Sequence, residues 1–254
     1  MKILAHGLSD KGLARTHNED SFYADKDLGL LVVADGLGGH SAGEVASRMA
    51  VEALSGYIRK SYAGSGALIG PIDSGRSDAS NRLVSGIRFA NQVVCEAAEN
   101  NPAWKGMGTT IVAALADGGR LSIAHAGDSR AYLVRSGTIS QLTDDHSVVA
   151  ERVRKGLMSR VEAEGSRIRN LITRALGDDE ALEADVTEID IMDGDRLLLC
   201  SDGLNTMVAD EEVLMIIASD NAPESACTRL VEVANNNGGS DNITVVAAFF
   251  TAKV

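Results

Sequence analysis

Acidic residues recur in this sequence where apolar runs end. The run LLVVA ends in Asp35 followed by Gly36, and the run LLLCS is followed by Asp202 and Gly203. An apolar run without charge is typical of a buried strand, and a glycine beside the acid lets the backbone turn and approach a ligand closely. Each Asp-Gly pair alone also fits an ordinary turn. Their repetition favours two carboxylates that share one site.

Three further aspartates lie at the edges of β-like runs: Asp20, Asp128 and Asp241. For Asp128, in the tetrapeptide GDSR, a turn in which the side chain caps its own backbone fits equally well. Several carboxylates brought together repel one another unless cations neutralise them. Oxygen ligands without Cys or His favour Mg²⁺ or Mn²⁺ over Zn²⁺. Two such ions would activate a shared water and hold a phosphoryl oxygen, which predicts a two-metal hydrolase.

A polar segment, RTHNED, precedes the second β-like run and begins with Arg15. By itself it fits a solvated loop. Beside a metal cluster, Arg15 would offer a planar guanidinium that binds phosphate with two hydrogen bonds. The histidines are dispersed, and His6 and His125 are predicted to be strand residues without a role. His40 and His146 lie near the candidate acids and are predicted to support the site or the fold rather than to bind metal.

Competing chemistries are absent from the sequence. It contains no C-x-x-x-x-x-R loop, no phosphate-binding G-x-x-x-x-G-K-[ST] loop, no H-E-x-x-H helix and no G-x-S-x-G elbow. These absences exclude cysteine phosphatases, P-loop nucleotidases, zinc proteases and serine hydrolases of those types.

Composition narrows the class of protein further. The 254 residues are 44% hydrophobic, and we expect one domain, residues 1–254. A formal charge of −12 argues against nucleic acid or an anionic membrane as partner. Three scattered cysteines without C-x-x-C spacing favour a reducing compartment. With no apolar segment of about 20 residues and no leader pattern, we expect a soluble cytoplasmic protein without a membrane span.

Hydrophobic periodicity predicts strands in runs rather than strands alternating with helices. This order favours antiparallel sheets covered by helices over a parallel sheet. The β-like runs within 3–9 and 20–35 are predicted to be neighbouring antiparallel strands, and 109–116 and 120–126 a hairpin that 131–135 continues as a meander. Later strands are expected at 184–191, 195–200 and 245–250, helices at 41–60, 78–100, 210–218 and 223–236, and a flap of short helices at 147–180.

Seven short motifs occur in a fixed order along the chain. They are Arg15 with Asn18-Glu19-Asp20, Asp35-Gly36-Leu37-Gly38-Gly39-His40, Gly108-Thr109-Thr110, Gly127-Asp128-Ser129-Arg130, Asp145-His146, Ser201-Asp202-Gly203 and Ser240-Asp241-Asn242. Together they resemble the PPM family, the PP2C-type protein serine/threonine phosphatases, and in particular its compact bacterial members. The resemblance covers residues 7 to 250, and its specificity comes from the order of motifs that are individually weak.

The resemblance implies an α+β fold, a four-layer α-β-β-α sandwich with two central antiparallel β-sheets. It implies hydrolysis of phosphoserine and phosphothreonine on proteins by a metal-bridging water, with two core Mn²⁺ or Mg²⁺ ions. Asp35 would bridge the two ions, Gly36 would offer its carbonyl to one, and Asp202 and Asp241 would hold the other. Asp20 would act largely through metal-bound water.

The remaining roles are also implied by the resemblance. Glu19 would support the metal-bound shell, Arg15 would bind the phosphate, and Asp128 with Asp202 would form a weaker third metal site. Several eukaryotic members have His directly after the Asp-Gly pair, whereas this chain has Leu37, which leaves His40 or metal-bound water as the general acid. The flap would influence substrate choice.

The implied protein is a cytoplasmic monomer whose partners are phosphorylated proteins and a serine/threonine kinase that it opposes. Two other classes of function share the fold or the metals. A catalytically silent phosphoprotein-binding module is disfavoured because every metal-site acid is present. A phosphoesterase acting on nucleotides or nucleic acid is disfavoured by the acidic balance and the lack of a basic groove.

Overall fold

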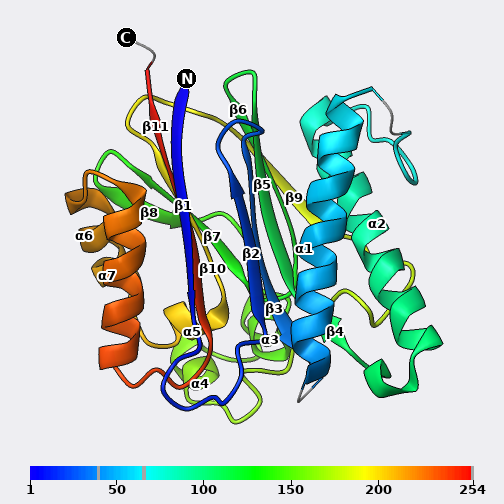
Figure 1. Cartoon of the computed structure of the whole chain (residues 1–254). Coiled ribbons are helices and arrows are strands. Elements are labelled where there is room, and N and C mark those ends of the chain that lie inside the picture. Colours follow the sequence, from blue (N-terminus) through cyan, green and yellow to red (C-terminus); the bar gives the residue numbers. More distant parts are fainter. Residues whose placement is uncertain (39–40, 65–66, 253–254) are drawn as a thin grey trace.

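Two antiparallel sheets face each other at the centre of the molecule, and helices cover both outer faces (Figure 1). In this computed structural model, which describes residues 1–38, 41–64 and 67–252, the strand orders are β1-β11-β10-β7-β8 and β2-β3-β5-β6-β9, with β4 paired to β3. The predicted four-layer α+β sandwich is therefore confirmed.

The bounds of the strands follow the sheet order. The first sheet contains β1 (Lys2–Asp10), β11 (Ile243–Thr251), β10 (Arg196–Cys200), β7 (Arg130–Arg135) and β8 (Thr138–Gln141). The second contains β2 (Asp20–Asp25), β3 (Leu30–Leu37), β4 (Gly108–Thr109), β5 (Ile111–Asp117), β6 (Arg120–Ala126) and β9 (Asp185–Asp190).

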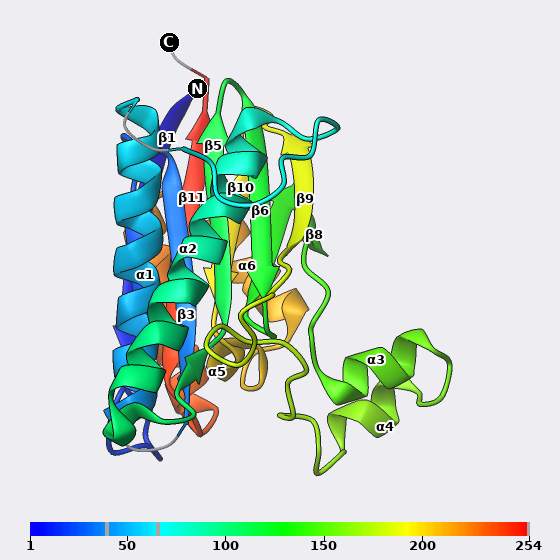
Figure 2. The ribbon, with the colours of Figure 1, turned by 90° about the vertical axis from the view of Figure 1, so that its right-hand side faces the viewer.

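The helices form the outer layers and one projection. The second sheet is covered by α1 (Ser41–Tyr62) and α2 (Asp78–Asn100), which is followed by the 3-10 turn η1 (Pro102–Trp104). The first sheet is covered by α6 (Asp210–Ser219) and α7 (Pro223–Asn236), with the short α5 (Asp202–Asn205) before them. Helices α3 (Val148–Arg154) and α4 (Arg160–Glu164) project from the body (Figure 2). No helix of the described residues combines the length and apolar character needed to cross a bilayer.

Strand β3 shows why an uncharged run lies at the centre of the fold. Leu30 and Val32 pack into the core beneath α1 and α2, whereas Leu31 and Val33 pack into the core between the two sheets. Because successive side chains of a strand point to opposite faces, both sets must be apolar when both faces are covered. The end of this strand is thereby held rigidly, and it carries Asp35.

Two predicted pairings are wrong. Strand β1 does not pair with β2 but with β11, over the whole register from Lys2–Thr251 to Asp10–Ile243, because the buried strand β11 needs a neighbour on each side. The meander also does not continue: β6 pairs with β9, and β7 crosses to the other sheet beside β10. The crossing occurs at Gly127, whose φ of 111° suits glycine. This turn carries Asp128.

The close contact between the end of β3 and the start of α1 requires a glycine, without a side chain, at position 36. A Cβ on Gly36 would overlap the carbonyl oxygen of Gly43 and would lie 2.6 Å from that of Glu19. Both obstacles are backbone atoms, so they cannot move aside as a side-chain tip does. A Cβ on Gly56, within α1, would meet no atom within 4 Å, and this position therefore serves as a matched control.

We expect Gly36→Ala to lower the free energy of unfolding by about 1–3 kcal/mol because it forces two backbone segments apart. Gly56→Ala should instead raise it by about 0.5–1 kcal/mol, since alanine is the better helix former and meets open space. Urea denaturation of both variants in EDTA measures the difference. Equal stability of Gly36→Ala and the parent protein would show that the two backbone segments can separate at little cost.

Candidate active site

The five aspartates singled out in the sequence reach one end of the sandwich from both sheets. Asp20 opens β2 and stands opposite Asp35 of β3 in the strand register. Asp202 opens α5, Asp241 comes just before β11, and Asp128 lies in the turn from β6 to β7. In Figure 1 this is the lower end, where α5 and the start of α1 lie. The structure thus brings together the residues that the apolar runs indicated.

Their electrostatics show that the five carboxyl groups act on one another. Burial raises the pKa of Asp35 well above its usual value, and the charges of Asp20, Asp202, Asp128 and Asp241 raise it further. Burial first, and neighbouring carboxylates second, raise the pKa of Asp20 and of Asp128 to about 7 and that of Asp202 to about 6. Without cations, the cluster therefore does not carry its full charge at neutral pH.

The same cluster fits divalent cations. All its donors are carboxylate oxygens, which hard ions such as Mg²⁺ and Mn²⁺ prefer. Asp20 Oδ2 accepts a hydrogen bond of 2.8 Å from Ser201 Oγ, but the buried Asp20 Oδ1 has no hydrogen-bond partner among the described residues. Buried polar atoms are rarely left unpaired. An orphaned carboxylate oxygen among mutually repelling acids is an arrangement that a bound cation would stabilise.

Arg15 lies at the rim of this cluster. Its Nη2 donates to Asp241 Oδ2 at 2.7 Å, and 53% of its side chain is exposed. The hydrogen bond to Asp241 raises the pKa of the guanidinium, so its positive charge is secure. A guanidinium that is hydrogen-bonded on one side and open to solvent on the other can bind an incoming phosphate.

Asn242 holds the loop that carries Arg15. Its Nδ2 donates to the carbonyl oxygens of Lys11 and His17 at 2.8 and 2.9 Å, and its Oδ1 accepts from the Glu19 amide at 2.8 Å. The amide side chain thus replaces backbone partners for a loop that lies outside both sheets. The loop and Asp241 are therefore positioned by one buried residue.

Glu19 and Gly36 lie against each other beside the cluster. The Gly36 amide donates to the Glu19 carbonyl at 3.1 Å. The Glu19 carboxylate lies close to Gly43 in the first turn of α1, where the helix dipole favours a negative charge, although burial raises its pKa. His40, the other residue predicted to support the site, lies outside the described residues.

Sequence reasoning assigned no role to Asn242, Ser201 and Thr110. Ser201 donates to Asp20, and Thr110 Oγ1 accepts from the Asp35 amide at 3.0 Å. Each is next to, or within, a motif that was noted for its acids or glycines. In the sequence, each of them could be recognised as a polar residue at a position that the alternation of the strand predicts to be buried. Their hydrogen-bond partners, however, become visible only once the strands are paired.

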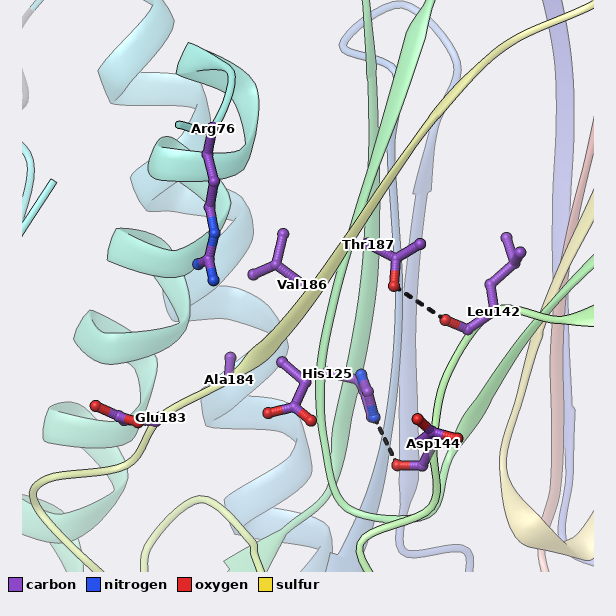
Figure 3. A pocket seen from close by; sticks show the side chains of 9 residues that line it. Arg76, His125, Leu142, Asp144, Glu183, Ala184, Val186 and Thr187 are labelled. Atoms are coloured by element: carbon purple, nitrogen blue, oxygen red, sulfur yellow. Dashed lines mark hydrogen bonds between the residues drawn. The ribbon is translucent and has the colours of Figure 1, made fainter. Parts of the chain in front are cut away.

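A separate pocket of about 380 Å³ lies beside β9 (Figure 3). Its lining residues are Arg76, His125, Leu142, Asp144, Glu183, Ala184, Asp185, Val186 and Thr187. At its inner wall His125 stacks on His146, with ring centroids 4.6 Å apart and planes 13° from parallel. None of the five clustered aspartates lines it. The predicted phosphate chemistry therefore does not belong to this pocket.

The two histidines and Asp185 are close enough to suggest a metal site, since one ligand atom from each lies within 4.8 Å of the others. Two features oppose that role. The lone pairs of nearly parallel rings do not converge on one ion. In addition, His146 Nδ1 accepts from the Gly127 amide at 3.1 Å, so Nε2 carries the proton and points at Asp185, 3.2 Å away. His146 supports the turn that carries Asp128, consistent with its predicted structural role.

A family model described as protein phosphatase 2C matches residues 4–243. The chain belongs to this family. The match confirms the predicted family, and the family uses Mn²⁺ or Mg²⁺.

Similar curated proteins are named serine/threonine phosphatases. The serine/threonine protein phosphatase PstP of Mycobacterium tuberculosis is 42% identical over 240 residues, which are 94% of this chain and 43% of PstP. The chain thus spans less than half the length of that relative. The serine/threonine phosphatase stp of Listeria monocytogenes is 38% identical over 241 residues, 94% of this chain and 92% of the relative.

Solved structures of PP2C relatives have the same fold. The crystal structure of M. tuberculosis PstP/Ppp superposes with a TM-score of 0.86 at 38% identity, covering 98% of this chain and 99% of that one. The catalytic domain of PstP in complex with two manganese ions gives a TM-score of 0.84 at 38% identity, with the same coverage. A metal centre is therefore present in a close structural relative.

The raised pKa of Asp128 predicts how stability depends on pH. Between the unfolded value of 3.8 and the folded value of about 7, the native protein holds a proton on Asp128 that the unfolded chain lacks. The contribution of Asp128 to the free energy of unfolding therefore falls as pH rises through this window. In EDTA, the free energy of unfolding of Asp128→Asn relative to that of the parent protein should therefore rise by roughly 1–3 kcal/mol from pH 4 to pH 8.

Urea denaturation of both proteins across this range measures the gain. The buried His125 and His146, whose pKa values are lowered, titrate with the opposite sign, but they are present in both proteins and cancel in the difference. Saturating Mn²⁺ should abolish the gain, because a cation then favours the ionised carboxylates. A stability difference that is independent of pH would mean that Asp128 is ionised throughout.

Proposed function

We propose that this chain is a metal-dependent protein phosphatase that hydrolyses phosphoserine and phosphothreonine on proteins. The observation that carries the proposal is the cluster of five mutually repelling aspartates with Arg15 at its rim. The names of the relatives support the substrate class. A catalytically silent module on the same fold has no use for all five acids, since each one adds repulsion that folding must overcome.

Each residue has a defined task in this proposal. Asp35 would serve both ions, with the Gly36 carbonyl at one and Asp202 and Asp241 at the other. Asp20 would act largely through metal-bound water. Asp128 would complete a weaker third site with Asp202. When bound, the ions would activate water at neutral pH and neutralise charge on the phosphoryl oxygens.

The other residues would orient the substrate and the acids. Arg15 would bind two phosphoryl oxygens through its planar guanidinium and hold the ester in line. Ser201 would keep Asp20 turned toward the cluster through its 2.8 Å hydrogen bond. Asn242 would keep the Arg15 loop in place through its hydrogen bonds to Lys11, His17 and Glu19.

We further propose residues 1–254 as one catalytic domain with a flap at residues 147–180. We propose a cytoplasmic monomer that acts in signalling and opposes a serine/threonine kinase. The three cysteines without a disulfide and the formal charge of −12 support this setting. The same charge disfavours nucleic acid and anionic membranes as partners.

Turnover of p-nitrophenyl phosphate should require added Mn²⁺ or Mg²⁺ and survive alkylation of the cysteines, since no thiol is proposed to react. Asp35→Asn and Asp202→Asn remove charge at nearly constant shape and should reduce kcat by about a thousandfold or more. The exposed Asp27, in the turn at the opposite end of β2, supplies the control Asp27→Asn, which should keep full activity. Turnover that resists EDTA but not alkylation would refute the proposal.

Arg15→Ala should raise KM for phosphopeptides about tenfold or more while the rise in Tm on adding Mn²⁺ persists, because Arg15 is proposed to bind phosphate rather than metal. Arg15→Lys should recover only part of the loss, since it keeps the charge but not the planar pair of donors. Steady-state kinetics and thermal unfolding with and without Mn²⁺ give both readings. Loss of the Mn²⁺-induced rise in Tm in Arg15→Ala would show that Arg15 helps to build the metal site.

A further inference from the structure

Residues 148–171, which lie within the proposed flap, form a basic arm in an acidic protein. Ser147 and Ile172 form a β-bridge that closes the arm at its base, and the arm itself contains α3 and α4. Six Lys and Arg and three Glu lie within it, a net charge of +3, whereas the whole chain carries −12. The sign of the charge thus reverses in the segment that stands clear of the body (Figure 2).

Several positively charged side chains of the arm are exposed to solvent and are not paired with a described acidic side chain. Arg152, Arg154 and Arg167 are exposed and form no ion pair with another described side chain, whereas Lys155 pairs with Glu151 at 3.4 Å. A structural role would pair these guanidinium groups with the arm's own acids. Exposed arginines are instead suited to bind carboxylates of another molecule.

Apolar side chains are exposed beside these cations. Leu157 is 73% exposed and Val161 79% exposed, where α3 ends and α4 begins. Nothing in the body of the protein covers them among the described residues. Arginine next to exposed apolar side chains is a composition typical of protein-binding surfaces.

The base of the arm is bonded to the active-site turn. The Thr173 amide donates to the His146 carbonyl at 2.7 Å, and the His146 amide donates to the Gly127 carbonyl at 3.0 Å, next to Asp128. Leu176 and Thr109 form a further bridge beside β3. The base of the arm is thus bonded to the turn that carries Asp128, at the edge of the acid cluster.

The acids that follow the arm do not cancel its charge. Asp178, Asp179 and Glu180 are exposed, but this segment is held against α2, where Asn91 Nδ2 donates to the Asp179 carbonyl at 2.8 Å. They therefore belong to the body, on the side of the second sheet. The exposed cations of α3 are therefore not neutralised by these acids.

We infer that the basic arm docks acidic residues that flank the phosphorylated residue of the substrate protein. The inference rests on the proposed phosphatase function and adds a substrate class to it. An acidic segment would be repelled by most of this surface, and the arm is where charge complementarity favours it. The Arg side chains would bind the flanking carboxylates, and Leu157 and Val161 would contact an apolar neighbour.

Two phosphothreonine peptides test this, one with flanking Glu and one with Gln at the same positions. The parent protein should show a kcat/KM about three- to tenfold higher on the Glu peptide, as expected for a few exposed ion pairs. The preference should vanish in about 1 M NaCl, where the Debye length is about 3 Å. R152E/R154E should lose or invert the preference, and R152K/R154K should retain most of it.

The controls separate docking from catalysis and from net charge. K2E/K26E changes the net charge equally on exposed lysines at the opposite end of the strands and should keep the preference. All variants should hydrolyse p-nitrophenyl phosphate as the parent protein does. Fluorescence anisotropy of the labelled peptides on EDTA-treated protein repeats the comparison without turnover.

Equal use and equal binding of the Glu and Gln peptides by the parent protein would overturn the docking role while leaving the phosphatase function intact. A preference lost equally in K2E/K26E would also overturn it, since net charge would then suffice. No hydrolysis of any phosphate ester would refute the phosphatase function, and the anisotropy comparison would still decide whether the arm binds acidic peptides.

Discussion

The repulsion among five carboxyl groups is the constraint on which this structure depends. Burial raises the pKa of Asp20 and Asp128 to about 7, and every neighbour adds to the cost of ionising Asp35. Left to itself, such a cluster would separate. It is held together because the acids are attached to the ends of strands that cannot move independently, in two sheets that share one core.

The mutually repelling aspartates are divided between the two sheets of the sandwich. Asp20 and Asp35 are neighbours within one sheet, whereas Asp202 and Asp241 come from the adjacent ends of β10 and β11 in the other. Hydrogen bonds join the two groups: Ser201 donates to Asp20, and Asn242 accepts from the Glu19 amide. The apolar core between the sheets therefore fixes the spacing of the acids, and these polar contacts fix their direction.

Sequence reasoning found the elements and the acids because both are local signals. Helix α2 was predicted at its observed bounds, and each clustered aspartate follows or precedes an apolar run. The pairing of β1 with β11 and the crossing of β7 were not found, since they depend on which strands still lack a neighbour once the sheets assemble. For the same reason Ser201 and Asn242 had no visible role: their partners lie 181 and 223 or more residues away in the sequence.

In the proposed function, Arg15 links the charge of the cluster to recognition of phosphate. It is hydrogen-bonded to Asp241, an acid proposed to hold a cation, and half of it is exposed. One positive group thus compensates part of the repulsion at the same carboxylate that a metal ion would neutralise. If a bound cation neutralised Asp241, the hydrogen bond from Arg15 to Asp241 would weaken, and the guanidinium would be able to turn its donors toward an anion. Metal binding and phosphate binding would then favour each other without any movement of the sheets.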